Sequence, residues 1–170
     1  WEKKHFILRQ LFASDVNRLV EILVQICERQ RKYRDYTRAE LRTMLQELIA
    51  SFSVYRTYFS SQESSIALRD KEYIEQAIQS ATANRPDIEA ELFRFMKELL
   101  LLRMPGVKEY DFVMRFQQLT GPVMAKGVED TTFYNYHRLI CLNEVGCDPN
   151  RFSMTVKEFH HALRRSQEEW

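Results

Sequence analysis

The sequence predicts a mostly α-helical protein: a helical bundle with one short extended segment at 52–59 and one irregular, loop-rich arm at 121–152. Three observations favour this class. Only 4 Gly and 4 Pro occur in 170 residues. Apolar side chains recur every three or four residues over most of the chain, as on one face of a helix. Two Thr-x-x-Glu patterns have the form of helix-starting capping boxes. A chain of this length suits one core, so we expect a single domain over 1–170.

The first half contains three predicted helices. Ser14 or Asp15 can cap the first, which ends at the polar run RQRKYRDY and carries the apolar stripe Val16, Leu19, Leu23 and Ile26. Thr37 and Glu40 form a capping box for the second, with the stripe Leu41, Met44, Leu45 and Leu48. The β-branched and aromatic residues of FSVYRTYF (52–59) then favour an extended segment or short strand. A third helix is expected from Asp70 to Ala83.

Three more helices are predicted in the second half. Pro86 suits the first turn of the longest one, which ends at MPG (104–106) and carries the stripe Ile88, Leu92, Phe95, Met96 and Leu99. VKEYDFVMRFQQLTGP supplies another, stopped by Gly121 and Pro122. Thr155 and Glu158 form a second capping box for a helix that runs toward the C-terminus.

Composition excludes several classes of protein. A formal net charge of +1 gives no field that would gather nucleic acid or an anionic membrane. The longest apolar run, around Leu99–Leu102, is far shorter than the roughly 20 residues of a membrane span. Three cysteines, an odd number, favour a reducing compartment, so we expect a cytoplasmic protein. Because the chain begins WEKKHF without Met, we expect it to be a segment of a longer protein.

The arm carries no pattern typical of a metal, nucleophile or phosphate site. His137, Cys141 and Cys147, even with His160 and His161, do not have the spacing of paired zinc ligands. We expect the thiols to be buried as small apolar groups, without the neighbouring base that a nucleophile needs. GPVMAKG lacks the glycine spacing and Lys-Ser/Thr pair of a phosphate loop. No cofactor or metal is therefore predicted.

The residue types in VEDTTFYNYHRL suit a sugar. Aromatic rings can pack on the C–H face of a pyranose, and charged or amide groups can hydrogen-bond its hydroxyls. A purely structural interpretation remains open beside this one. In it Phe133 and Leu139 belong to the core, Tyr134 and Tyr136 keep their hydroxyls at the surface, and the charged residues form solvated salt bridges or a helix cap.

Several segments resemble the maltooligosyltrehalose synthase family, the (1→4)-α-D-glucan 1-α-D-glucosylmutases of the α-amylase superfamily. The arm stretch LTGPVMAKGVEDTTFYNYHRLICLNEVGCDPNRF is similar to that family's signature, above all in K-G-V-E-D-T followed by L-N-E-V-G. FSVYRTYF resembles its fPVYRTY segment, and the tail FHHALRRSQEEW also matches. The resemblance departs from the pattern at Ser53, Thr132, Asn135 and Cys147, where Pro, Ala, Arg and Gly are usual.

The resemblance implies a helical insertion subdomain of a (β/α)8-barrel enzyme, between its acid/base glutamate and its last catalytic aspartate. It implies an intramolecular transglycosylase that converts the reducing-end α-1,4 bond of a maltooligosaccharide to α,α-1,1, giving maltooligosyltrehalose for trehalose biosynthesis. The catalytic carboxylates would lie outside residues 1–170, so the isolated chain should be inactive. Its partners would be the α-1,4-glucan and the barrel.

The same resemblance implies that the chain forms a wall of the substrate cleft. The substrate-binding candidates are Lys126, Glu129, Asp130, Tyr134, Tyr136, Arg138, Asn143 and Glu144, with Arg56 and Tyr58 as further possibilities. Asn135 lacks the guanidinium that is usual there, and Cys147 replaces a residue with freer backbone conformation. Two alternatives stay open: a helical module that binds a protein partner through the apolar stripe within 88–102, or part of an α-glucan hydrolase of the same superfamily.

Overall fold

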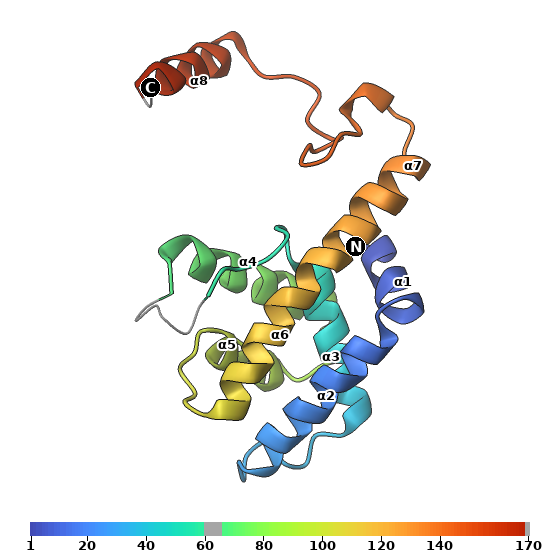
Figure 1. The fold of residues 1–170 in the computed structure, drawn as a ribbon, viewed down its shortest axis with the longest axis vertical. Helices are drawn as coiled ribbons and strands as arrows, with labels where there is room; N and C mark the ends of the chain where they lie inside the picture. Colours follow the sequence, from blue (N-terminus) through green and yellow to red (C-terminus); the bar gives the residue numbers. More distant parts are fainter. Residues whose placement is uncertain (60–65, 169–170) are drawn as a thin grey trace.

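The computed structural model describes residues 1–59 and 66–168, and every regular element in these ranges is a helix (Figure 1). The prediction of a mostly α protein is therefore confirmed. The helices are α1 (Glu2–Gln10), α2 (Ala13–Glu28), α3 (Arg38–Ser51), α4 (Leu68–Asn84), α5 (Ala90–Leu100), α6 (Val107–Met124), the π-helix η1 (Ala125–Thr132), α7 (Phe133–Asn135), the 3-10 turn η2 (Ile140–Leu142) and α8 (Val156–Glu168).

Helices α1 to α6 pack around one apolar core. Its largest fully buried side chains include Phe93 and Phe95 of α5 and Phe112 and Phe116 of α6. The predicted stripe on α5 is buried except for Ile88, which precedes the helix and is only partly covered. This burial leaves the protein-interaction module without the exposed surface that it requires.

Both predicted capping boxes are present. The Thr37 hydroxyl oxygen accepts from the Glu40 backbone amide at 3.3 Å, and Glu40 accepts from the Thr37 amide at 2.8 Å. At α8, Glu158 accepts from the Thr155 amide at 2.7 Å and the Thr155 hydroxyl accepts from the Glu158 amide at 3.2 Å. Each box satisfies two backbone groups that a helix start would otherwise leave unpaired.

Several predicted boundaries are wrong. Helix α2 begins at Ala13 after Phe12, so neither Ser14 nor Asp15 caps it. Helix α5 begins at Ala90 rather than at Pro86, and α6, with 18 residues, is longer. Segment 52–59 is non-helical as predicted but forms no strand; the Gln117 side chain instead pairs with both backbone groups of Phe59, at 3.1 and 3.0 Å.

The largest correction concerns Gly121 and Pro122, which do not stop a helix. Helix α6 continues to Met124, and η1 and α7 extend the helical path to Asn135, so the irregular arm begins at Tyr136 rather than at 121. Leu119 and Val123, on either side of the pair, are buried. Their burial offsets the cost of a helix-breaking pair, which outweighs the local signal. In η1 the hydroxyls of Thr131 and Thr132 donate to carbonyls five residues earlier, each at 2.7 Å.

Helix α1 was not predicted, because its buried face carries polar residues. Glu47 of α3 is fully buried and accepts from Trp1 Nε1 at 2.7 Å, His5 Nε2 at 3.0 Å and Asn84 Nδ2 at 3.0 Å. Lys4, also buried, donates from Nζ to the Phe52 carbonyl at 2.5 Å. Polar contacts thus join the buried Ile7 and Leu8 in fixing α1 to the bundle.

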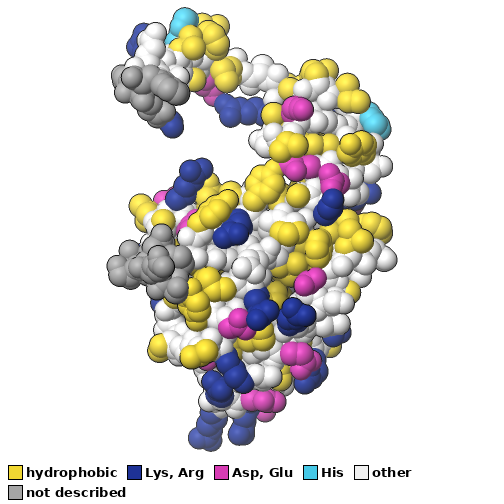
Figure 2. Space-filling view, viewed as in Figure 1, with side chains coloured by type: hydrophobic (Ala, Val, Ile, Leu, Met, Phe, Trp, Pro, Cys, Tyr) yellow, Lys and Arg dark blue, Asp and Glu magenta, His cyan; other side chains and the backbone are white. Residues whose placement is uncertain are grey.

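The arm after α7 leads away from the bundle to α8 (Figure 1). Every residue from 156 to 167 is exposed, including the apolar Val156, Phe159 and Leu163. In the space-filling view the arm curves over the bundle with an open gap between them (Figure 2). Across the described residues, no helix combines the length and apolar character needed to span a membrane.

The lowered pKa values of His5 and Glu47 predict a loss of stability in acid. Burial holds the pKa of His5 below its ordinary 6.5, although Glu47 opposes this. Burial pushes the pKa of Glu47 up, but hydrogen bonds from Trp1 and Asn84 outweigh it, leaving the pKa below 4.5. The unfolded chain therefore takes up protons at higher pH than the folded chain, and the free energy of unfolding should fall as pH drops from 6.5 through 4.5.

Thermal unfolding followed by circular dichroism between pH 8 and pH 4 measures this effect. His5→Gln should flatten the upper part of the Tm profile, whereas the matched change His161→Gln, on exposed α8, should leave its slope unaltered. An unchanged slope in His5→Gln would contradict the assignment.

Close packing of α1 on η1 predicts opposite effects for two glycines. A Cβ on Gly127 would lie 3.0 Å from Lys4 Cα and 3.1 Å from Lys4 N, both backbone atoms of α1. Gly127→Ala should therefore destabilise by about 1–3 kcal/mol despite the better helix propensity of Ala. A Cβ on Gly121 meets only the Tyr55 carbonyl at 3.8 Å, so Gly121→Ala should be neutral or stabilise by up to about 1 kcal/mol. Denaturant unfolding of both variants tests the pair, and equal effects would refute the contact.

Candidate functional site

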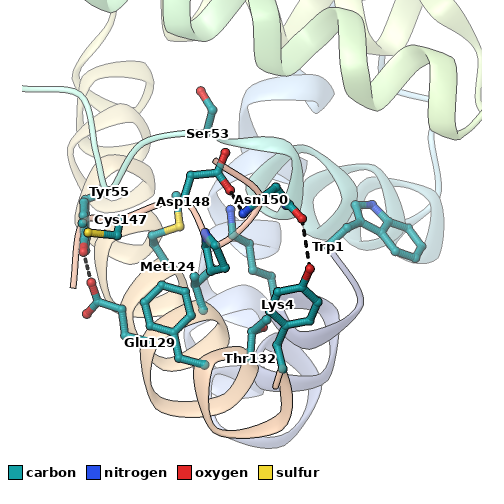
Figure 3. A pocket seen from close by; sticks show the side chains of 15 residues that line it. Trp1, Lys4, Ser53, Tyr55, Met124, Glu129, Thr132, Cys147, Asp148 and Asn150 are labelled. Carbon is teal, nitrogen blue, oxygen red and sulfur yellow. Dashed lines mark hydrogen bonds between the residues drawn. The ribbon is translucent and has the colours of Figure 1, made fainter. Parts of the chain in front are cut away.

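The helical path from Met124 to Asn135 separates two hollows where segments distant in sequence meet. The larger hollow, of about 550 Å³, lies against α1, segment 53–55 and the loop at 146–150 (Figure 3). The smaller hollow, of about 430 Å³, lies against the turn at 137–145. Glu129 and Phe133 line both hollows. Three of the segments that carry the family resemblance, around 52–59, 126–131 and 142–146, therefore meet at this helical path, whereas the resembling tail lies on α8.

Polar groups of the larger hollow are held by hydrogen bonds. The Tyr55 hydroxyl donates to the Glu129 carboxylate, and this bond raises the pKa of Tyr55 to about 12. The Tyr136 hydroxyl donates to Asn150 Oδ1 at 3.3 Å, joining the end of α7 to the loop at 146–150. Asp148 Oδ1 accepts from the Asn150 amide at 2.9 Å, which fixes the loop turn. Glu129 and Tyr136, both predicted from the sequence, thus share one hollow.

The smaller hollow brings together five predicted residues. They are Glu129, Asp130, Tyr134, Asn143 and Glu144. The Tyr134 side chain is 77% exposed, so it presents an open face at the rim. An exposed aromatic ring beside carboxylates has the mixed character that suits a sugar.

Four predicted residues line neither hollow. Lys126 forms an ion pair with Asp130 at 2.5 Å, with both side chains about half exposed, and this hydrogen bond raises the pKa of Lys126. The guanidinium of Arg138 lies 3.9 Å from the Phe152 ring centroid. Arg56 stacks over Tyr58 at 4.7 Å. The Lys126–Asp130 pair has the geometry of the solvated salt bridge that the structural interpretation expected.

Sequence reasoning missed several residues of the larger hollow: Trp1, Lys4, Tyr55, Asp148 and Asn150. Tyr55 stands inside the VYRTY segment and could have been chosen beside Arg56 and Tyr58. The sequence Asp-Pro-Asn at 148–150 is also typical of a polar turn. Lys4 had no such signal, because its position depends on how α1 packs.

Only one of the three cysteines is buried as predicted. Cys27 is buried as expected, and burial raises its pKa to about 12, which removes it as a nucleophile at neutral pH. Cys141 and Cys147 are exposed, so their predicted burial is wrong. In the described ranges, no group of three His, Cys, Asp or Glu side chains could hold a metal ion.

Fold and site together define a helical subdomain that presents a polar and aromatic surface at one end of a bundle. Comparison with known proteins finds the same enzyme among the similar solved structures and the similar sequences. The structure of a mutant maltooligosyltrehalose synthase from Arthrobacter ramosus matches 98% of this chain at 29% identity with a TM-score of 0.75. A hypothetical maltooligosyl trehalose synthase from Sulfolobus tokodaii matches 94% at 27% identity and a TM-score of 0.55.

Proteins with similar sequences carry the same enzyme name. Putative maltooligosyl trehalose synthases from two Mycobacterium tuberculosis strains are each 49% identical over 57 residues, 34% of this chain. No protein-family model matches. The matches cover 8% of these relatives and 19% of the Arthrobacter chain, so the chain is similar to a segment of the enzyme. The resemblance to maltooligosyltrehalose synthase is confirmed.

The turn at Asn143 predicts a structural role for one of the candidates. Asn143 Nδ2 donates to the carbonyls of Phe133, at 2.8 Å, and Tyr136, closing the chain after α7. Asn143→Asp keeps the shape of the side chain but removes the donor. Amide hydrogen exchange over 136–152 should accelerate, with little change in the Tm of the bundle.

Glu144→Gln provides the control, since the exposed Glu144 side chain lines the same hollow without closing the turn. Equal exchange rates in the two variants would show that Asn143 does not order the arm.

Proposed function

We propose that residues 1–170 act as a single helical subdomain of a maltooligosyltrehalose synthase, and that the surface around η1 and α7 forms a wall of its substrate cleft. The observation that carries the proposal is the meeting of the three resembling segments around one helical path. Hollows lined by apolar and aromatic side chains with a few polar groups are the usual form of small-molecule sites. The cytoplasmic location expected from the unpaired cysteines is part of the same proposal.

The whole enzyme cleaves the reducing-end α-1,4 bond of a maltooligosaccharide and rejoins the released glucose as an α,α-1,1 bond. Two successive displacements retain the anomeric configuration. The catalytic carboxylates belong to the barrel outside this chain. Between the two displacements glucose must turn over without escaping and water must stay out, which a covering wall of aromatic and charged groups achieves.

The geometry supports different contributions from the two hollows. Glu129 lines both and is already held by Tyr55, so its carboxylate is oriented before a ligand arrives. Tyr134 and Tyr136 offer rings on opposite hollows. The Lys126–Asp130 pair stands on the same helical stretch, where it orients the Asp130 carboxylate of the smaller hollow.

A hydrolase of the same superfamily would need a similar wall. The two reactions differ in product: transfer leaves a non-reducing trehalosyl end, whereas hydrolysis releases a new reducing sugar. Counting reducing ends after exhaustive reaction with maltopentaose distinguishes them. The Arthrobacter match over 98% of this chain supports the transferase.

Substitution of the η1 charges tests the proposal. In the full-length enzyme, Lys126→Ala, Glu129→Ala and Asp130→Ala should each lower kcat/KM by on the order of a hundredfold, equivalent to about 2.7 kcal/mol of transition-state stabilisation. Stability should change by no more than about 1 kcal/mol, because Lys126 and Asp130 are half exposed.

Arg115→Ala is the matched control. Arg115 and Asp111 form an exposed ion pair of the same i,i+4 spacing on α6, at 2.9 Å, away from both hollows. Kinetics like those of the control in all three η1 variants would show that these charges only stabilise the helix.

A further inference from the structure

We propose that Lys4 of α1 is a substrate-binding residue that donates hydrogen bonds to hydroxyl oxygens of one glucosyl unit in the larger hollow. This inference rests on the proposed function and extends its site to α1, which lies outside the three motif segments 52–59, 126–131 and 142–146. Lys4 lines the hollow together with Tyr55, Met124 and Thr132 (Figure 3).

The ammonium group of Lys4 has more N–H donors than the described residues engage. The residue is only 6% exposed, and within the described part of the chain its one hydrogen bond goes to the Phe52 carbonyl at 2.5 Å. A lysine ammonium carries three N–H donors. Taking a charge out of water is costly when its donors are unmatched, so two donors beside a hollow favour a ligand with acceptor oxygens.

Charges around the hollow select a neutral polyol over an anion. Glu129 and Asp148 line the same space as Lys4, so a phosphate or carboxylate ligand would meet two negative groups. A sugar hydroxyl can accept from Lys4 and donate to a carboxylate. Burial lowers the pKa of Lys4 to about 8, so the ammonium group is still charged at neutral pH.

The remaining walls fit the apolar faces of a pyranose. Met124, Val128 and Phe133 come from the helical path, and two further rings come from Tyr55 in the extended segment and Tyr136 just after α7. A volume of about 550 Å³ falls within the range of small-molecule sites. The loop at 146–150 adds Asn150, whose amide oxygen already accepts from Tyr136.

The kinetic test uses the full-length enzyme with maltopentaose as substrate. Lys4→Met keeps the length of the side chain and removes its donors. KM should rise about tenfold, because the sugar loses hydrogen bonds donated by a charged group, and kcat should change less. The control is Lys3→Met, on the same helix but exposed and absent from the hollow, which should retain wild-type KM.

A second measurement does not depend on how the variant folds. In the wild-type enzyme, reductive methylation read by mass spectrometry should be slowed at Lys4 by maltopentaose, with the rate at Lys3 unchanged. Wild-type KM in Lys4→Met without protection of Lys4 would overturn the inference and leave the proposed function intact. If the wild-type enzyme produced no trehalosyl ends from maltopentaose, the proposed function itself would fail. Protection of Lys4 by maltopentaose would still support a glucan site in that case.

Discussion

Packing of α1 on η1 at Gly127 is the constraint on which the arrangement of the site depends. Because position 127 has no side chain, the backbone of α1 at Lys4 lies against the π-helix. That approach carries Lys4 beneath the larger hollow, where it binds the Phe52 carbonyl and thereby holds the start of segment 52–59. Tyr55, three residues further on, then reaches Glu129. One close backbone contact thus positions α1, the extended segment 52–59 and η1 relative to one another.

The parts of the fold that local chemistry decides could be predicted from the sequence. Capping at Thr37 and Thr155 needs residues only three positions apart, so both helix starts were correct. The helix end predicted at Gly121 and Pro122 is wrong for the opposite reason. Their local cost is real, but burial of Leu119 and Val123 against other helices outweighs it, and no local pattern reports that burial. Helix α1 escaped notice because Lys4 and His5 are buried through polar partners on distant segments.

The candidate site shows the same division. Resemblance to a family selected residues by their place in a motif, and most of the selected set does surround the two hollows. Motif membership does not say which side chain faces a ligand and which closes a turn, as Asn143 illustrates by binding two backbone carbonyls. Nor can it find Lys4, whose exposure to the hollow depends on tertiary packing. The site could therefore be predicted where residues close in sequence form it. It could not be predicted where the packing of α1 brings a distant residue to it.

In the π-helical segment η1, the number of residues per turn determines which side chains face the two hollows. An α-helix turns about 100° for each residue, since it holds 3.6 residues per turn. Hydrogen bonds in η1 reach back five residues instead of four, as the bond from the Phe133 amide to the Val128 carbonyl does. A turn closed by five-residue bonds holds about one residue more than an α-helical turn, so removing one residue between 125 and 132 would let the segment close as an α-helix with the elements on either side near their present orientation. The change would fall on the side chains of 125–132, which would be redistributed around the helix axis relative to the two hollows. The extra residue of η1 thus determines which of these side chains face each hollow.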